Sequence, residues 1–154
     1  MLTHLWDNAI QKILKKMEKI KLKFTKDFSP YPGGRSRSTG DNSAEEFYEE
    51  VLRGKFLEAK ESDKKLEIDL DGSAGYAGSF LDEAFGRLGH EFKFDECKNR
   101  LEFITTEEPY LEEDILGSIE QWSVDGIHYN SALAKDIELK ENNYFTKVKK
   151  KKKK

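Results

Sequence analysis

The segment that most constrains the fold of this chain is residues 66–88, where the spacing of the apolar residues changes. Leu66, Ile68 and Leu70 alternate with acidic residues, which is the two-residue repeat of a half-buried strand. After a glycine-rich stretch, apolar residues recur every three or four positions over residues 80–88, as they do along one face of a helix. A strand that leads directly into an amphipathic helix predicts a sheet covered by helices.

Both periodicities recur elsewhere along the chain. Ser43 and Glu46 have the spacing of a capping box, in which two side chains satisfy free backbone N–H groups at a helix start. Gly89 is expected to end the helix that begins near residue 80. The predicted helices are 2–17, 44–53 (or on to 59 past Gly54), 80–88 and 109–122, and the predicted strands are 19–25, 66–70, a segment around Phe92 and Phe94, and one around Leu101 and Phe103.

This order of elements predicts an α/β (α+β) fold with one sheet covered by helices and an added N-terminal amphipathic helix. The length of 154 residues suits one folded domain. The expected organisation is an N-terminal helix over 1–18, the domain over 19–122, an irregular C-terminal extension over 123–146 and a disordered lysine-rich tail over 147–154.

The N-terminal helix has a continuous apolar face and three candidate partners for it. It could pack on its own sheet, which is the favoured interpretation, pair with a second subunit to form a homodimer, or lie on an anionic membrane through its lysines. The apolar face comprises Leu2, Leu5, Trp6, Ala9, Ile10, Ile13, Leu14 and Met17.

Charge is distributed unevenly along the chain. The net charge is −3, but seven Lys lie in residues 1–26 and seven more in 147–154. Between these ends, 28 acidic residues against 13 Lys and Arg give residues 27–146 a net charge of −15. An acidic body repels the phosphate backbone of DNA and RNA, so nucleic-acid binding is disfavoured.

Cys97 is the only cysteine, so an intrachain disulfide is excluded and a cytoplasmic, reducing setting is expected. No run of apolar residues approaches the roughly 18 residues of a membrane span. His4, His90 and His128 are widely separated in sequence, and none of the spacings is typical of a metal site. We therefore expect neither a metal nor a cofactor, and a non-enzymatic protein.

Residues 66–88 also carry a family resemblance, in the run LEIDLDGSAGYAGSFLDEAFGRL. The acidic–apolar strand, the glycine-rich turn and the helix that opens with Ser79–Phe85 resemble the STAS-like domains of unknown function. The upstream segments Pro32–Arg35 and Ser43–Phe47 are similar to the same family. The resemblance covers about residues 19–122 and implies a STAS-like fold with a single mixed sheet covered by helices.

More distantly, the segment is similar to anti-sigma factor antagonists, in which a serine at a helix start is phosphorylated by a partner kinase. Aligned without gaps, that serine falls on Ser79, although Ala77, Gly78 and Phe80 depart from the motif. The resemblance implies a bacterial or archaeal signalling protein whose partner is a histidine-kinase-like ATPase acting as a serine kinase or anti-sigma factor.

Two sets of site residues follow from these patterns. Ser79 is a candidate phosphoacceptor, because a helix start stabilises a phosphate, and with Phe80, Asp82 and Glu83 it forms a candidate docking surface. From the residues alone, the favoured interpretation of Ser79, together with Asp82, is an ordinary N-cap.

The second set would serve a small-ligand or nucleotide-binding domain that uses the 72–79 turn. Arg35, Gly75 and Gly78 are candidates for binding an anion, through a guanidinium group and free backbone N–H groups. The favoured interpretation is that the glycines only permit a tight turn and that Arg35 lies in a solvated loop.

Overall fold

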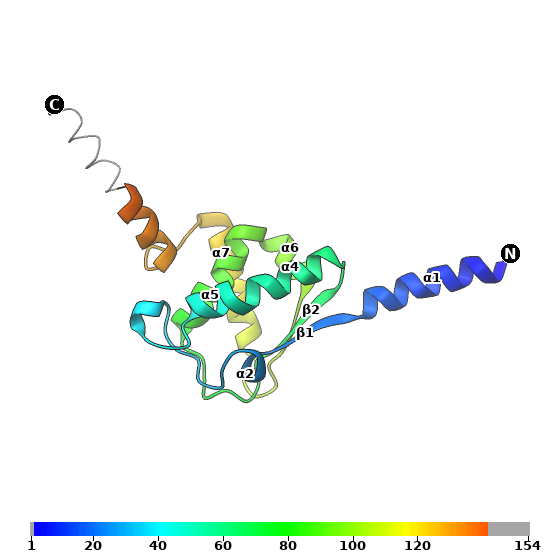
Figure 1. Cartoon of the computed structure of the whole chain (residues 1–154), viewed down its shortest axis with the longest axis horizontal. Coiled ribbons are helices and arrows are strands. Elements are labelled where there is room, and N and C mark those ends of the chain that lie inside the picture. The colour runs from blue at the N-terminus through cyan, green and yellow to red at the C-terminus, as the bar shows by residue number, and fades with distance from the viewer. Residues whose placement is uncertain (1, 142–154) are drawn as a thin grey trace, which may run out of the picture.

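The computed structural model describes residues 2–141, and Figure 1 shows a body of helices and strands from which the N-terminal helix projects. The elements are α1 (Leu2–Met17), β1 (Lys19–Lys23), α2 (Phe24–Asp27), η1 (Arg37–Thr39), α3 (Ala44–Phe47), η2 (Tyr48–Leu52), α4 (Arg53–Glu61), β2 (Lys65–Asp69), α5 (Gly78–Phe92), α6 (Phe94–Arg100), β3 (Leu101–Ile104) and α7 (Leu111–Asp125). Residues 132–141 are also helical. The expected tail at 147–154 lies outside the described residues.

The three strands form one sheet in the order β1-β2-β3, and both pairs are parallel. Leu22, Ile68 and Phe103 lie side by side across the sheet in register. The α/β class is confirmed, with a sheet that is parallel throughout rather than mixed. Each parallel pair needs a crossover, and α3–α4 and α5–α6 supply the helices of the two crossovers.

The two faces of the sheet have opposite character. One face carries the apolar side chains of the alternating pattern, including Leu22, Leu66 and Ile68, which are at most 1% exposed. The other face carries charged side chains that pair between strands. The ion pairs are Lys19 with Glu67 at 3.4 Å, Lys19 with Glu102 at 2.6 Å and Lys23 with Asp69 at 3.0 Å.

The core is rich in aromatic side chains. The Phe24 ring, at the end of β1, makes edge contacts with Phe47, Tyr76 and Phe80 at centroid distances of 4.8, 5.0 and 5.6 Å. These rings come from α2, α3, the turn before α5, and α5 itself, so this cluster fixes the segments around the turn. The predicted first strand ends early, because Phe24 already belongs to the short helix α2.

The two helices α5 and α7 pack closely because glycines lie between them. A Cβ atom on Gly86 would overlap the indole ring of Trp122, and one on Gly89 would lie 2.8 Å from Ile119 Cα. The prediction that Gly89 ends the helix is therefore wrong: α5 continues to Phe92, and the missing side chain at Gly89 allows the backbone of α7 to approach.

The second predicted helix also continues through Gly54, as in the longer alternative, and ends at Glu61.

Three further predictions are corrected by the structure. Phe92 and Phe94 lie at the end of α5 and the start of α6, so they do not form a strand. The described part of the extension, residues 123–141, is largely helical rather than irregular, with α7 reaching Asp125 and a helix over 132–141. The favoured packing of α1 on the sheet is wrong, because α1 projects away from the body (Figure 1) and its Trp6 side chain is 69% exposed.

Lys93 separates α5 from α6 with φ +74° and ψ 157°, a conformation that favours glycine. Lys93→Gly is expected to stabilise the protein by about 1 kcal/mol, because glycine adopts this backbone without steric cost. The measurement is the free energy of unfolding in urea. The matched control is Lys98→Gly, at an exposed position inside α6, which is expected to destabilise by about the same amount. Destabilisation by both variants would contradict the prediction.

Candidate functional site

The turn before α5 lies beyond the carboxyl ends of the strands, beside the loops that follow β1 and β3 (Figure 1). Asp71 accepts hydrogen bonds from the hydroxyl and backbone N–H of Thr106 and from the backbone N–H of Glu107. Ala74 N–H donates to Pro30 O at 2.9 Å. We name residues 71–79 the turn surface. It is fixed by these bonds to both neighbouring loops.

Several residues of the turn surface face solvent. Ala74, Ala77, Gly78 and Ser79 are exposed, and Tyr31, next to the Pro30 contact, is 69% exposed. By contrast, Tyr76 turns inward, where its hydroxyl donates to Leu70 O and burial raises its pKa to about 12. The turn surface therefore combines a partly buried aromatic anchor with small exposed side chains.

Ser79 is the second residue of α5, and its side chain is exposed. The N-cap is Ala77, whose carbonyl accepts from Phe80 N–H at 3.0 Å and from Leu81 N–H at 3.3 Å. The interpretation of Ser79 as the N-cap is therefore wrong. Because the first N–H groups of a helix have no intrahelical partner, the Ser79 hydroxyl stands in the most positive part of the helix field.

Two other residues of the predicted docking set are placed in the interior. Phe80 and Glu83 are both 0% exposed, so the prediction that they contribute to a docking surface is wrong. The reason is the helical period: position 79 faces outward, and positions 80, 83 and 84 face the core. Asp82 is partly buried and is engaged by Trp122 and Arg35.

A network of buried ion pairs surrounds Glu83. Its Oε2 accepts from Arg87 Nε at 2.8 Å and from the Ser131 hydroxyl at 2.8 Å, and its Oε1 accepts from Ala132 N–H at 3.1 Å. The carboxylate therefore joins α5 to the start of the helix over 132–141, where a negative charge is favourable. The same network continues to the 3.4 Å pairs of Arg87 with Glu45 and Glu49.

The network raises the pKa of Arg87. Burial lowers the pKa of the guanidinium, but the hydrogen bond that it donates to Glu83 and the negative charges of Glu83, Glu45 and Glu49 outweigh that effect. The charge of Arg87 is thus held in the interior by three carboxylates. These ion pairs and hydrogen bonds stabilise the fold, because they connect four segments of the chain: α3, η2, α5 and the start of the helix over 132–141.

The positive charge of Arg35 is not free to bind an anion together with the glycines of the turn. Its Nη1 lies 3.0 Å from Asp82 Oδ2 and 3.8 Å from Glu83 Oε1, so its charge is already paired. Gly75 has φ +123°, which an L side chain rarely adopts, and thus has a conformational reason to be glycine. The prediction of an anion site formed jointly by Arg35, Gly75 and Gly78 is not supported by this pairing.

Sequence reasoning missed the partners that complete the network. Glu83 and Arg87 are four residues apart on a helix, which is the spacing of an ion pair, and this signal was available. Ser131 donates to Glu83 from 48 residues away and Trp122 donates to Asp82 from 40 residues away, and no local pattern indicates such contacts.

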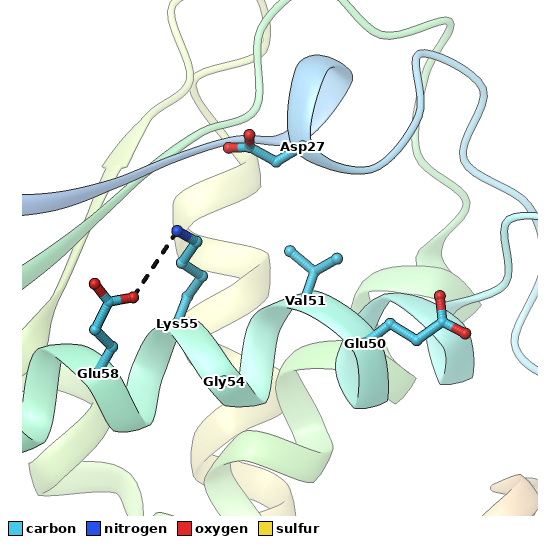
Figure 2. Close-up of a pocket in the computed structure, with 6 residues that line it drawn as sticks. All are labelled: Asp27, Glu50, Val51, Gly54, Lys55 and Glu58. Atoms are coloured by element: carbon cyan, nitrogen blue, oxygen red, sulfur yellow. Dashed lines mark ion pairs between the residues drawn. The ribbon is translucent and has the colours of Figure 1, made fainter.

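The surface also has an acidic hollow of about 350 Å³ between α2 and the η2–α4 helix. Figure 2 shows Glu50, Gly54 and Glu58 along one side of the helix, with Asp27 opposite and Lys55 paired to Glu58 at 3.9 Å. The hollow lies apart from the turn surface, and sequence analysis did not identify it. The spacing of Glu50, Gly54 and Glu58 at four-residue intervals was the signal for it.

Metal-ligating side chains do not gather in the part of the chain that the structure describes: within residues 2–141, no three His, Cys, Asp or Glu side chains are placed to hold an ion together. Cys97 is buried, and burial raises the pKa of its thiol to about 12. Over the same residues, every helix is too short or too polar to cross a lipid bilayer.

Comparison with known proteins identifies the class of the central domain. Residues 43–111, which run from the N-cap of α3 to the first residue of α7, match the model of a family described as STAS-like domain of unknown function (DUF4325). This part of the chain is therefore a STAS-like domain of that family, and the resemblance seen in the sequence is confirmed over these residues. No curated protein and no solved structure matches the chain.

Proposed function

We propose that the chain is a non-enzymatic regulatory module that binds a protein partner on its turn surface, residues 71–79. The observation that carries the proposal is the exposure of Ser79 at the start of a helix that is anchored in the core by the next two residues, Phe80 and Leu81. Phosphorylation of Ser79 would add about two negative charges at a place where the helix dipole stabilises them.

The proposed partner is a histidine-kinase-like ATPase acting as a serine kinase, in a bacterial cytoplasm. This part of the proposal rests on the similarity of the segment to anti-sigma factor antagonists, in which a serine at the corresponding position accepts the phosphate. The exposed position of Ser79 is compatible with that chemistry, since a kinase must reach the hydroxyl.

The alternative, a nucleotide-binding domain using the same turn, has less support. A nucleotide phosphate needs a free cation or converging N–H groups, and the Arg35 charge is already paired with Asp82 at 3.0 Å. The turn also lacks the spacing of a phosphate-binding glycine loop.

The test compares Ser79→Asp and Ser79→Ala in the full chain, with purified histidine-kinase-like ATPases as partners and ATP as phosphate donor. Ser79→Asp is expected to change the dissociation constant of the partner at least about tenfold, because it places a charge on the contact surface. Ser79→Ala is expected to abolish phosphate incorporation measured by mass spectrometry. The stability of both variants is expected to stay within about 0.5 kcal/mol of the parent, because position 79 is exposed.

Ser38→Asp is the matched control, because Ser38 is also exposed but belongs to η1 outside the turn surface. It is expected to leave the dissociation constant unchanged. Equal affinity of the parent and Ser79→Asp for every partner that binds would contradict the proposal. Phe80→Asp is unsuitable as a test because Phe80 is fully buried, and a charge there would unfold the domain.

A further inference from the structure

The helix α1 exposes a row of large apolar side chains that the rest of the described chain does not cover. The exposed fractions are 69% for Trp6, 47% for Ile10, 58% for Ile13, 49% for Leu14 and 67% for Met17. Figure 1 shows α1 extending from the start of β1, away from the other helices. A contiguous apolar row of this kind on a folded protein indicates an interaction surface.

The charges on and next to α1 indicate which surface it fits. The helix contains Lys12, Lys15 and Lys16, and residues 1–26 hold seven Lys against only Asp7 and Glu18. A helix that combines Trp and aliphatic residues on one side with lysines elsewhere is suited to the interface of an anionic lipid bilayer. Residues 147–154 add seven more lysines to the same chain, and clusters of this size attract anionic lipid.

A second copy of the chain is a poorer occupant of this surface. A 16-residue helix is about 24 Å long and helices pack about 10 Å apart, so two paired α1 helices would cover only on the order of 300 Å² on each copy. Stable interfaces bury about 800 Å² per partner. Pairing would also bring two lysine-rich segments together, which is repulsive.

The acidic body of the protein is not suited to contact an anionic membrane. Residues 27–146 carry a net charge of −15 and are repelled by an anionic surface. Because α1 projects from the body, it can reach the lipid while most of the body stays beyond the screening length, which is about 8 Å at physiological salt.

We infer that α1 is an in-plane membrane-binding helix for anionic lipid: Trp6, Ile10, Ile13, Leu14 and Met17 enter the acyl boundary and the lysines contact the headgroups. The helix lies on the bilayer and does not span it. This inference is independent of docking at the turn surface.

The experiment mixes the full chain with vesicles of phosphatidylcholine alone or with about one third phosphatidylserine, a content typical of an anionic leaflet. Co-sedimentation is expected with the anionic vesicles, weak with the neutral ones, and reduced when salt is raised from about 0.15 M to about 0.5 M. Trp6 reports insertion by a blue shift of its emission, since Trp122 is only 1% exposed and stays in the core. Trp6→Phe is expected to remove the shift while binding persists.

The double variant Ile10→Ser and Ile13→Ser is expected to weaken binding to anionic vesicles by at least about tenfold, through loss of buried apolar area. Its fold should be intact, because both side chains are exposed on a projecting helix. The matched control is Val124→Ser on α7, which removes a 77% exposed apolar side chain from the body and should leave binding unchanged.

Three outcomes overturn the inference. They are equal binding to neutral and anionic vesicles, unchanged binding by the double variant, and a Trp6 emission shift that depends on protein concentration without lipid. The last outcome, with a dimer detected by analytical ultracentrifugation, would assign the apolar row of α1 to a second copy of the chain.

Discussion

Gly89→Ala is expected to destabilise the protein by about 3 kcal/mol or more, because the added methyl group meets backbone that cannot rotate away. An ideal Cβ on Gly89 lies 2.8 Å from Ile119 Cα and 2.9 Å from Ile119 C, and it overlaps the carbonyl oxygen. The only relief is a separation of α5 from α7, the two helices that carry much of the core. Urea unfolding followed by far-ultraviolet circular dichroism measures the change.

The matched controls are Gly54→Ala and Gly117→Ala, in α4 and α7. A Cβ at either position meets nothing within 4 Å, and both glycines are exposed. Each substitution is expected to stabilise by up to about 1 kcal/mol, because alanine favours a helix interior. If Gly89→Ala behaved like these controls, close helix packing would not be the reason for glycine at position 89.

Arg87→Met is expected to cost about 3–5 kcal/mol, because it leaves the charge of Glu83 buried without its main partner. Glu83 is 0% exposed, and its remaining charged neighbour is Arg35 at 3.8 Å. The free energy of unfolding, again from urea titration, gives the size of the loss.

The double variant Glu83→Gln and Arg87→Met is expected to recover a large part of this loss, because it removes both charges and retains an amide that can bond to Ser131 and Ala132. Arg53→Met is the surface control. Arg53 pairs with Glu91 at 2.6 Å but is exposed, so its removal is expected to cost about 1 kcal/mol or less. Simple additivity of the two core substitutions would contradict a direct pair between Glu83 and Arg87.

The parts of the fold that the sequence predicts are those with a local physical cause. The alternation at Leu66, Ile68 and Leu70 identifies β2 because only a half-buried strand requires it, and Ser43 does cap α3 by accepting from Glu46 N–H. Gly89 was misinterpreted because glycine serves both helix ends and close helix contacts. Phe92 and Phe94 alternate like a strand, but the left-handed conformation of Lys93 between them joins two helices instead.

The candidate site was only partly predictable from the sequence, because only some of its features have a local cause. The strand–turn–helix pattern predicts that Ser79 lies at a helix start, because the pattern is contained within 23 consecutive residues, and the structure places Ser79 there, exposed and one residue inside α5. Which neighbours of Ser79 face outward depends on the rotation of α5 about its axis. That rotation is set by Trp122, Ile119 and Ser131, which no spacing near residue 79 indicates.

The position of β1 has a consequence for how other proteins can attach to the domain. Among residues 2–141 it is an outermost strand of the sheet, and one side of its backbone has no neighbouring strand from these residues to bond to. Such an edge invites strand addition and fibril-like growth, which natural proteins discourage with lysines. Lys19, Lys21 and Lys23 occupy every second position of β1, so a copy of the same strand arriving in register would meet like charges. This edge of the sheet therefore resists growth by the addition of a copy of β1.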